Sequence, residues 1–140
     1  YWYLLCEEVI DGRIKTFHIA RMKDLCLHED HFEKDTTLAK RLDKAINAWF
    51  NPNVEPYEVI LEISAEIKRY MLDHPIAPTQ KILQELPDGT FYLSLEITNE
   101  KEILSTIFKW IPHIRVIAPK ELQESVLLQT KTFLEKQVLL

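Results

Sequence analysis

Residues 81–98, KILQELPDGTFYLSLEIT, carry the clearest fold signal in this 140-residue chain. The pair Asp88-Gly89 separates two apolar segments, and such a pair is a strong short-range signal for a β-hairpin. The second segment alternates apolar and more polar side chains, which is the pattern of a strand with one buried face. The side chains expected to face the core are Phe91, Leu93, Leu95 and Ile97.

The segments around this hairpin alternate between strand and helix patterns. A strand is predicted for residues 57–63, and Ser64 is placed to cap a helix behind it. After the hairpin, Asn99 is expected to cap a second helix, which Pro112 ends before a last strand over residues 114–118. The resulting order, β-α-β-β-α-β, predicts a ferredoxin-like unit in which one sheet buries a single face under two helices.

The predicted core of this unit combines residues from its strands and helices. We expect Leu61, Phe91, Leu93, Leu95, Ile103, Ile107 and Val116 to share one core. Pro119 suits the first turn of a closing helix that runs to about residue 136. The buried side of this helix is predicted to carry Leu122, Val126, Phe133 and Leu134.

The N-terminal part predicts a smaller β structure. Asp11-Gly12 predicts a hairpin between strands over residues 2–10 and 13–22, with a short third strand over 24–27 that completes a β-meander. Residues 36–50 predict an amphipathic helix, capped by Asp35 or Thr36. Two prolines and two asparagines in residues 51–56 mark a boundary, so we expect an α+β chain with domains over 1–55 and 56–140.

Composition narrows the classes of protein further. The net charge of −5 argues against nucleic-acid binding by overall charge, and no apolar run is long enough for a membrane span. Cys6 and Cys26 are isolated, which favours a reducing, cytoplasmic setting with both thiols in the core. The first residue, Tyr1, is not Met, so we expect the chain to be a piece of a longer protein.

Two motifs in the N-terminal part resemble the WYL domain of bacterial transcription regulators. Trp2-Tyr3-Leu4 is similar to the tripeptide that names the family, and residues 15–22 resemble its strand Arg-x-Phe-Arg-Leu-Asp-Arg-Ile. Phe17 and Arg21 keep that pattern, whereas Lys15, His18 and Ala20 depart from it. From residue 57 onward the chain resembles the C-terminal extension of such proteins. The resemblance implies the end of an Sm-like or SH3-like β-barrel, and a DNA-binding helix-turn-helix outside this chain.

Residues 13–23 contain several cations and no acidic residue, although the chain is acidic overall. Strict alternation would place Arg13, Lys15, Phe17, Ile19 and Arg21 on one strand face, with His18 on the other. Such a face could hold an anion, a nucleotide or single-stranded nucleic acid. The alternative is that Phe17 and Ile19 are core residues beside a solvated edge. With the resemblance, we predict a ligand site formed by Tyr3, Arg13, Lys15, Phe17, His18 and Arg21.

Other polar clusters do not fit a catalytic or metal site. The spacing in His28-Glu29-Asp30-His31 differs from known zinc motifs, and Glu7-Glu8 would point to opposite faces of a strand. We therefore expect no enzyme activity, no metal and no cofactor. The predicted function is ligand sensing and homodimerisation in a DNA-binding transcription regulator, with nucleotide or single-stranded nucleic acid as the effector. The alternatives are a dimerisation module without a ligand, and an unrecognised small-molecule enzyme.

Overall fold

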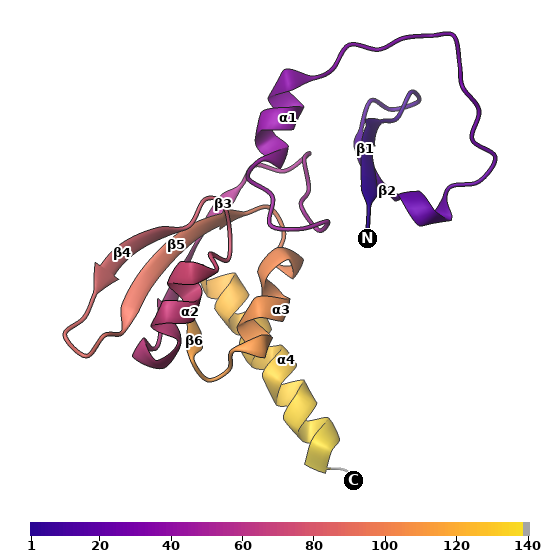
Figure 1. Cartoon of the computed structure of the whole chain (residues 1–140). Coiled ribbons are helices and arrows are strands. Elements are labelled where there is room, and N and C mark those ends of the chain that lie inside the picture. Colours follow the sequence, from indigo (N-terminus) through magenta and orange to yellow (C-terminus); the bar gives the residue numbers. More distant parts are fainter. Residues whose placement is uncertain (139–140) are drawn as a thin grey trace.

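The computed structural model describes residues 1–138 and contains two antiparallel sheets. β1 and β2 form a two-stranded sheet, and the other strands form a four-stranded sheet in the order β4-β5-β3-β6 (Figure 1). The predicted α+β class is confirmed. The strands are β1 (Tyr3–Glu7), β2 (Ile14–His18), β3 (Tyr57–Ile63), β4 (Lys81–Glu85), β5 (Phe91–Ile97) and β6 (Ile114–Ala118). The α-helices are α1 (Thr36–Leu42), α2 (Lys68–Asp73), α3 (Lys101–Lys109) and α4 (Lys120–Val138).

The β-α-β-β-α-β order is present from β3 to β6. A 3₁₀ turn (Ala65–Ile67) leads into α2, and the side chain of Ser64 accepts from the N–H of Glu66, as its capping role predicts. β5 pairs antiparallel with β3 and β4, and β3 also pairs antiparallel with β6. This arrangement is compatible with the predicted ferredoxin-like unit.

The core of this unit lies between the sheet and its helices. All seven predicted core residues are buried in one cluster, together with Met71 of α2 and Leu122 of α4. In register, Leu61 of β3 lies opposite Leu93 of β5, and neither side chain is exposed. The alternation along residues 91–97 therefore predicted the buried face correctly.

Both Asp-Gly pairs lie in hairpin loops, as predicted, but neither turn is a two-residue type I′ turn, in which both residues would have positive φ. Gly12 and Gly89 have φ of +66° and +86°, whereas Asp11 and Asp88 do not have positive φ. At the second hairpin, the N–H of Gly89 donates to Leu86 O (2.9 Å) and the N–H of Leu86 to Thr90 O (2.7 Å). This is a longer loop that ends in a left-handed glycine, so only one residue of each pair needs positive φ.

The N-terminal strands are shorter than predicted. β1 ends at Glu7, and β2 ends at His18, where a 3₁₀ turn (Ile19–Arg21) begins. Residues 24–27 form no strand, so the predicted meander is wrong. Leu25 and Leu27 are 78% and 101% exposed, so neither side chain packs against a strand. The partial barrel remains a prediction, since the structure shows only a two-stranded sheet here.

The helix predicted over residues 36–50 stops at Leu42. Asp35 caps its start by accepting from the N–H groups of Thr37 and Leu38, as expected. Beyond residue 43 the chain bends, because Ile46 N–H donates to the Glu102 carboxylate (3.3 Å) and Asn47 Nδ2 donates to Glu102 O (2.9 Å). These tertiary bonds replace the next helical turns.

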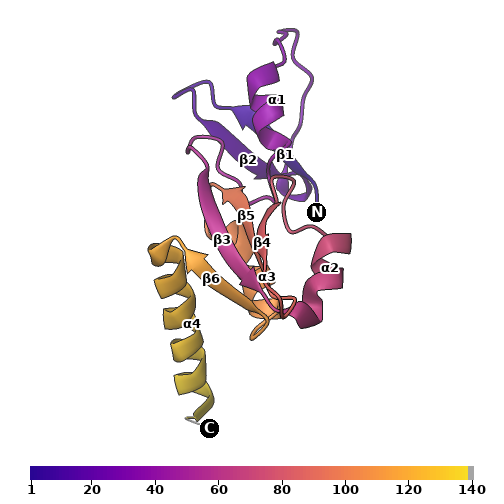
Figure 2. The ribbon, with the colours of Figure 1, turned by 90° about the vertical axis from the view of Figure 1, so that its left-hand side faces the viewer.

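α4 follows Pro119, and only its first turns cover the four-stranded sheet (Figure 2). Leu122 is buried and Val126 packs against the core, but Phe133 and Leu134 are 59% and 56% exposed. The prediction that they lie on the buried side is therefore wrong. The end of α4 extends away from the sheet, where no other element reaches it (Figure 2). Among residues 1–138, no helix combines the length and the apolar character that crossing a bilayer requires.

Three polar side chains meet on the sheet face opposite the core. The Glu62 carboxylate accepts from the guanidinium of Arg115 (2.7 Å) and from the hydroxyl of Tyr92 (2.8 Å). The hydrogen bond from Arg115, and then that from Tyr92, holds the pKa of Glu62 below its ordinary value. A carboxyl with a lowered pKa stabilises the folded chain above its unfolded-state pKa, and this contribution disappears as the pH falls through the folded-state pKa.

We expect Arg115→Gln to raise the pKa of Glu62 toward its ordinary value. The variant should be less stable than the parent at pH 7, and the difference should shrink at acid pH, where Glu62 is protonated in both. NMR titration of the Glu62 carboxyl carbon and urea unfolding at both pH values measure these effects. Lys120→Gln, which breaks an exposed pair with Glu124 (3.4 Å), is the control. An unchanged Glu62 pKa in Arg115→Gln would contradict the prediction.

Candidate ligand-binding site on the N-terminal hairpin

A hollow of about 360 Å³ lies at the end of the N-terminal hairpin. It combines aromatic, hydroxyl, imidazole and guanidinium groups, and its open side faces solvent. Four of the predicted ligand-site residues take part in it. Its lining residues are Tyr3, Thr16, Phe17, His18, Arg21 and Met22.

The hairpin register and the turn after it bring these side chains together. Tyr3 lies opposite His18 in the pairing of β1 with β2. A hydrogen bond from Ile19 N–H to Trp2 O (3.0 Å) continues this pairing. The 3₁₀ turn that follows, closed by the hydrogen bond from Met22 N–H to Ile19 O (3.1 Å), places Arg21 at the hollow. Strict alternation along residues 13–21 was therefore wrong beyond His18, because the chain leaves the strand there.

His18 lies between two tyrosine rings. Its ring centroid is 5.2 Å from that of Tyr1 and 5.0 Å from that of Tyr3. Its Nδ1 atom is buried, and no hydrogen-bond partner for it occurs in the described part of the chain. Buried polar atoms are nearly always hydrogen-bonded, and leaving one unsatisfied costs about 1–3 kcal/mol.

Arg21 supplies the positive charge of the hollow. Its guanidinium is exposed and forms no ion pair or hydrogen bond with any residue in the range 1–138. Phe17 beside it is 44% exposed, so an aromatic face and a cation are both accessible. The hollow could thus hold a planar ring and an anionic group at the same time.

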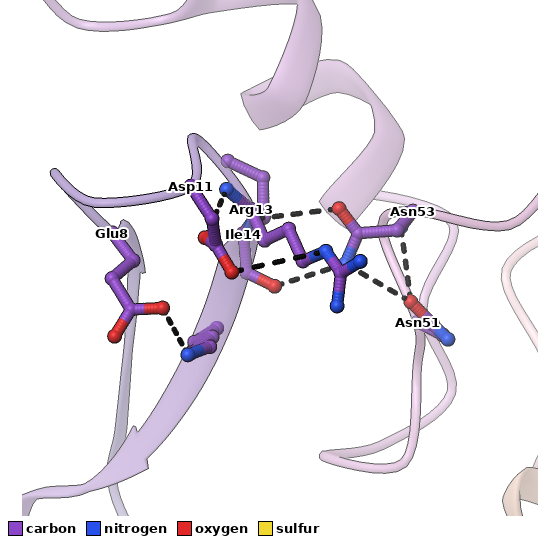
Figure 3. A network of polar contacts seen from close by, with 7 residues as sticks. Glu8, Asp11, Arg13, Ile14, Asn51 and Asn53 are labelled. Atoms are coloured by element: carbon purple, nitrogen blue, oxygen red, sulfur yellow. Dashed lines mark hydrogen bonds and ion pairs between the residues drawn. The ribbon is translucent and has the colours of Figure 1, made fainter.

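The other two predicted cations lie outside this hollow, near the hairpin turn. Lys15 forms an ion pair and hydrogen bond with Glu8, and this hydrogen bond raises the pKa of the ammonium group. Arg13 lies 3.8 Å from the Asp11 carboxylate, measured from Nε to Oδ2 (Figure 3). The six predicted residues therefore form two groups, of which only Tyr3, Phe17, His18 and Arg21 surround the hollow.

Sequence reasoning missed Thr16 and Met22. Thr16 lies two residues before His18 on β2, so the alternation that was applied to Phe17 also places it on the face of His18. Met22 follows the 3₁₀ turn and donates its N–H to Ile19 O (3.1 Å). No periodic pattern in the sequence indicated this turn, so none indicated that Met22 would line the hollow.

The remaining candidate groups lie elsewhere. His28 Nδ1 is 3.2 Å from the Asp30 carboxylate on an exposed segment. Cys6 is half-buried and Cys26 is exposed, so the prediction that both thiols are core residues is wrong for Cys26. Trp49 is 55% exposed, and Lys101 Nζ lies 4.6 Å from its ring centroid.

Comparisons with known proteins gave one match to part of the chain and one to most of it. The family model for the WCX domain matches residues 55–134. None of the curated proteins compared with the chain matches it. Among solved structures, the chain is similar to the proteasome accessory factor B/C (PafBC) of Arthrobacter aurescens, at 21% identity and a TM-score of 0.40. The similarity covers 89% of this chain but only 19% of that one, so the chain spans about a fifth of its length.

Proposed function

The chain belongs to the WCX domain family, which occurs in WYL-type regulators, and we propose that it is the ligand-sensing and oligomerisation region of a bacterial DNA-binding transcription regulator. The match covers residues 55–134, and the candidate ligand hollow lies in the segment before it. The observation that carries the sensing role is that Arg21, which has no ion-pair or hydrogen-bond partner among residues 1–138, lies beside the exposed Phe17 in one hollow. In this proposal the chain binds and does not catalyse.

The proposed ligand carries both an anionic group and a planar ring. Arg21 would hold the anion and Phe17 would offer a stacking face, and the ring of His18 would form part of the wall. A nucleotide or a short single strand of nucleic acid has this chemistry. DNA recognition by the parent regulator would use a helix-turn-helix outside this chain, and the two free cysteines favour a cytoplasmic setting.

We expect Arg21→Ala to weaken binding of a fluorescent oligothymidine about tenfold, since a hydrogen bond to a charged group contributes about 1.5–3 kcal/mol. Binding to the parent chain should also weaken as salt rises, because phosphate contacts release counterions. Fluorescence anisotropy at two salt concentrations measures both effects. The matched control is Arg69→Ala on α2, which removes another exposed arginine that does not line the hollow. Equal losses in the two variants would place the site elsewhere, and Lys15→Ala tests whether the ion-paired lysine belongs to it.

The rival function is a dimerisation module without a ligand of its own. The observation that favours this rival is the set of exposed apolar side chains on α4. Under both functions, the parent regulator is proposed to be a homodimer. The rival predicts that Arg21→Ala changes no binding equilibrium and that sedimentation gives the same assembly with and without the oligothymidine. The exposed large apolar residues of α4 are Leu127, Leu128, Phe133, Leu134 and Val138.

A further inference from the structure

The N-terminal hairpin is attached to the rest of the molecule at one polar contact. Residues 22–35 between the hairpin and α1 form no helix or strand and run around the outside of the molecule (Figure 1). Of the hydrogen bonds and ion pairs found within residues 1–138, only those between Ile14 and Asn53 join residues 1–34 to the later part of the chain. The position of β2 relative to the WCX domain therefore depends on Asn53 more than on any other polar side chain.

We propose that Asn53 is a positioning residue that couples the ligand-binding hairpin to the WCX domain. The side-chain amide of Asn53 satisfies both backbone groups of Ile14, the first residue of β2 (Figure 3). Its Oδ1 accepts from Ile14 N–H (3.3 Å) and its Nδ2 donates to Ile14 O (2.9 Å). The amide thus fixes one edge of β2 as a neighbouring strand would, and the hollow lies at the other end of the same strand.

Asn53 is itself held by a chain of hydrogen bonds that ends inside the WCX domain. Asn51 Oδ1 accepts from Asn53 N–H (3.0 Å), and Asn51 N–H donates to Thr98 Oγ1 (2.7 Å). Thr98 Oγ1 in turn donates to the carboxylate of Glu102 (2.7 Å), a side chain only 1% exposed. Phe50 and Pro52 on either side of Asn51 are buried, so the backbone around Asn51 is held in place by packing as well as by these hydrogen bonds.

This connection gives a ligand a physical way to act at a distance. A ligand can shift an equilibrium only through its different affinity for two arrangements. If binding at Phe17 and Arg21 moves β2, Ile14 moves with it, and the bonds through Asn53, Asn51 and Thr98 carry that displacement to the start of α3. The ligand half of this inference rests on the proposed function, whereas the coupling between β2 and the WCX domain does not.

The coupling is tested without a ligand on the whole chain. Asn53→Ala should accelerate amide hydrogen exchange of Ile14 at least about threefold, the effect of one lost neutral hydrogen bond, and leave Leu93 unchanged. Residual dipolar couplings should show that β2 and β5 share one orientation in the parent and lose it in the variant. Asn47→Ala is the matched control, because Asn47 lies in the same segment and bonds Glu102 O and Trp49 N–H but not the hairpin. A common orientation retained in Asn53→Ala would overturn the proposal.

Transmission along the bonds is tested with Thr98→Val. Exchange of Ile14 should rise in this variant, and combining it with Asn53→Ala should add nothing, because both changes break one path. Additive effects, or no effect of Thr98→Val on the exchange of Ile14, would overturn transmission through these hydrogen bonds.

Oligothymidine should shift the Thr98 amide resonance in the parent but not in Asn53→Ala, and the same shift in both proteins would also overturn transmission through Asn53. If oligothymidine does not bind the parent at all, the proposed function fails while the exchange and orientation results still decide the coupling.

Discussion

Leu93→Ala is expected to lower the free energy of unfolding of the chain by about 2–5 kcal/mol, the range for truncating a buried leucine. Leu93 is at the centre of β5, opposite Leu61 on one side and Ile82 on the other, and its side chain is completely buried. Removing it loses apolar burial and leaves a cavity, because packed neighbours on the sheet and helices relax only partly.

Urea unfolding followed by far-UV circular dichroism measures this effect. The control is Leu128→Ala on α4, where the leucine is 65% exposed and the expected change is within about 0.5 kcal/mol. A loss below about 1 kcal/mol for Leu93→Ala would mean that the packed interface between sheet and helices does not contribute as the structure indicates.

The sequence predicted the WCX unit well because its signals are local and agree with each other. Alternation over residues 91–97 set the buried face of β5, and the Asp88-Gly89 pair fixed where the hairpin turns. Glycine also suits that turn sterically, since a Cβ on Gly89 would lie 3.0 Å from the Cβ of Ala65. Each feature depends on residues close in sequence, so periodicity alone could detect it.

The N-terminal part was predicted less well because tertiary contacts, or their absence, decide its structure. Apolar residues extended the predicted strands, yet Val9 and Ile10 are 100% and 92% exposed in a turn. The helix predicted over residues 36–50 stops early, because Ile46 N–H finds an acceptor on Glu102, a residue distant in sequence. No local pattern contains that information.

The candidate site was predicted in part, and partly for the wrong reason. The resemblance selected Phe17 and Arg21, which do share a hollow, but the 3₁₀ turn rather than strand alternation brings them together. Lys15 and Arg13 have carboxylate partners that sequence reasoning did not assign. Asn53 was missed, since an amide that bonds to a distant backbone leaves no periodic signal. Glu102 had a usable signal, because Asn99 and Glu102 have the spacing of a capping box.

Glu102→Ala is expected to lower the free energy of unfolding by about 3 kcal/mol, although it removes a charged side chain. One carboxylate oxygen accepts from Thr98 N–H (2.8 Å), Thr98 Oγ1 (2.7 Å) and Asn99 N–H (3.2 Å), and the other from Ile46 N–H (3.3 Å). Alanine would leave these donors without an acceptor in a place that is 1% exposed, and each unsatisfied donor costs about 1–3 kcal/mol before relaxation.

The Glu102→Gln variant separates the role of the acceptor atoms from that of the charge. Its carbonyl oxygen can still accept from Thr98 and Asn99, whereas its amide nitrogen would face the Ile46 N–H as a second donor. In urea unfolding, we therefore expect Glu102→Ala to lose more free energy of unfolding than Glu102→Gln. The control is Glu100→Ala, which removes a neighbouring carboxylate at the start of α3 and should change the free energy of unfolding by close to zero. Amide exchange of Ile46 should accelerate in both Glu102 variants and stay unchanged in the control. Equal losses for Gln and Ala would show that the charge matters more than the acceptor, and equal losses for all three would remove Glu102 as the anchor of the linking segment.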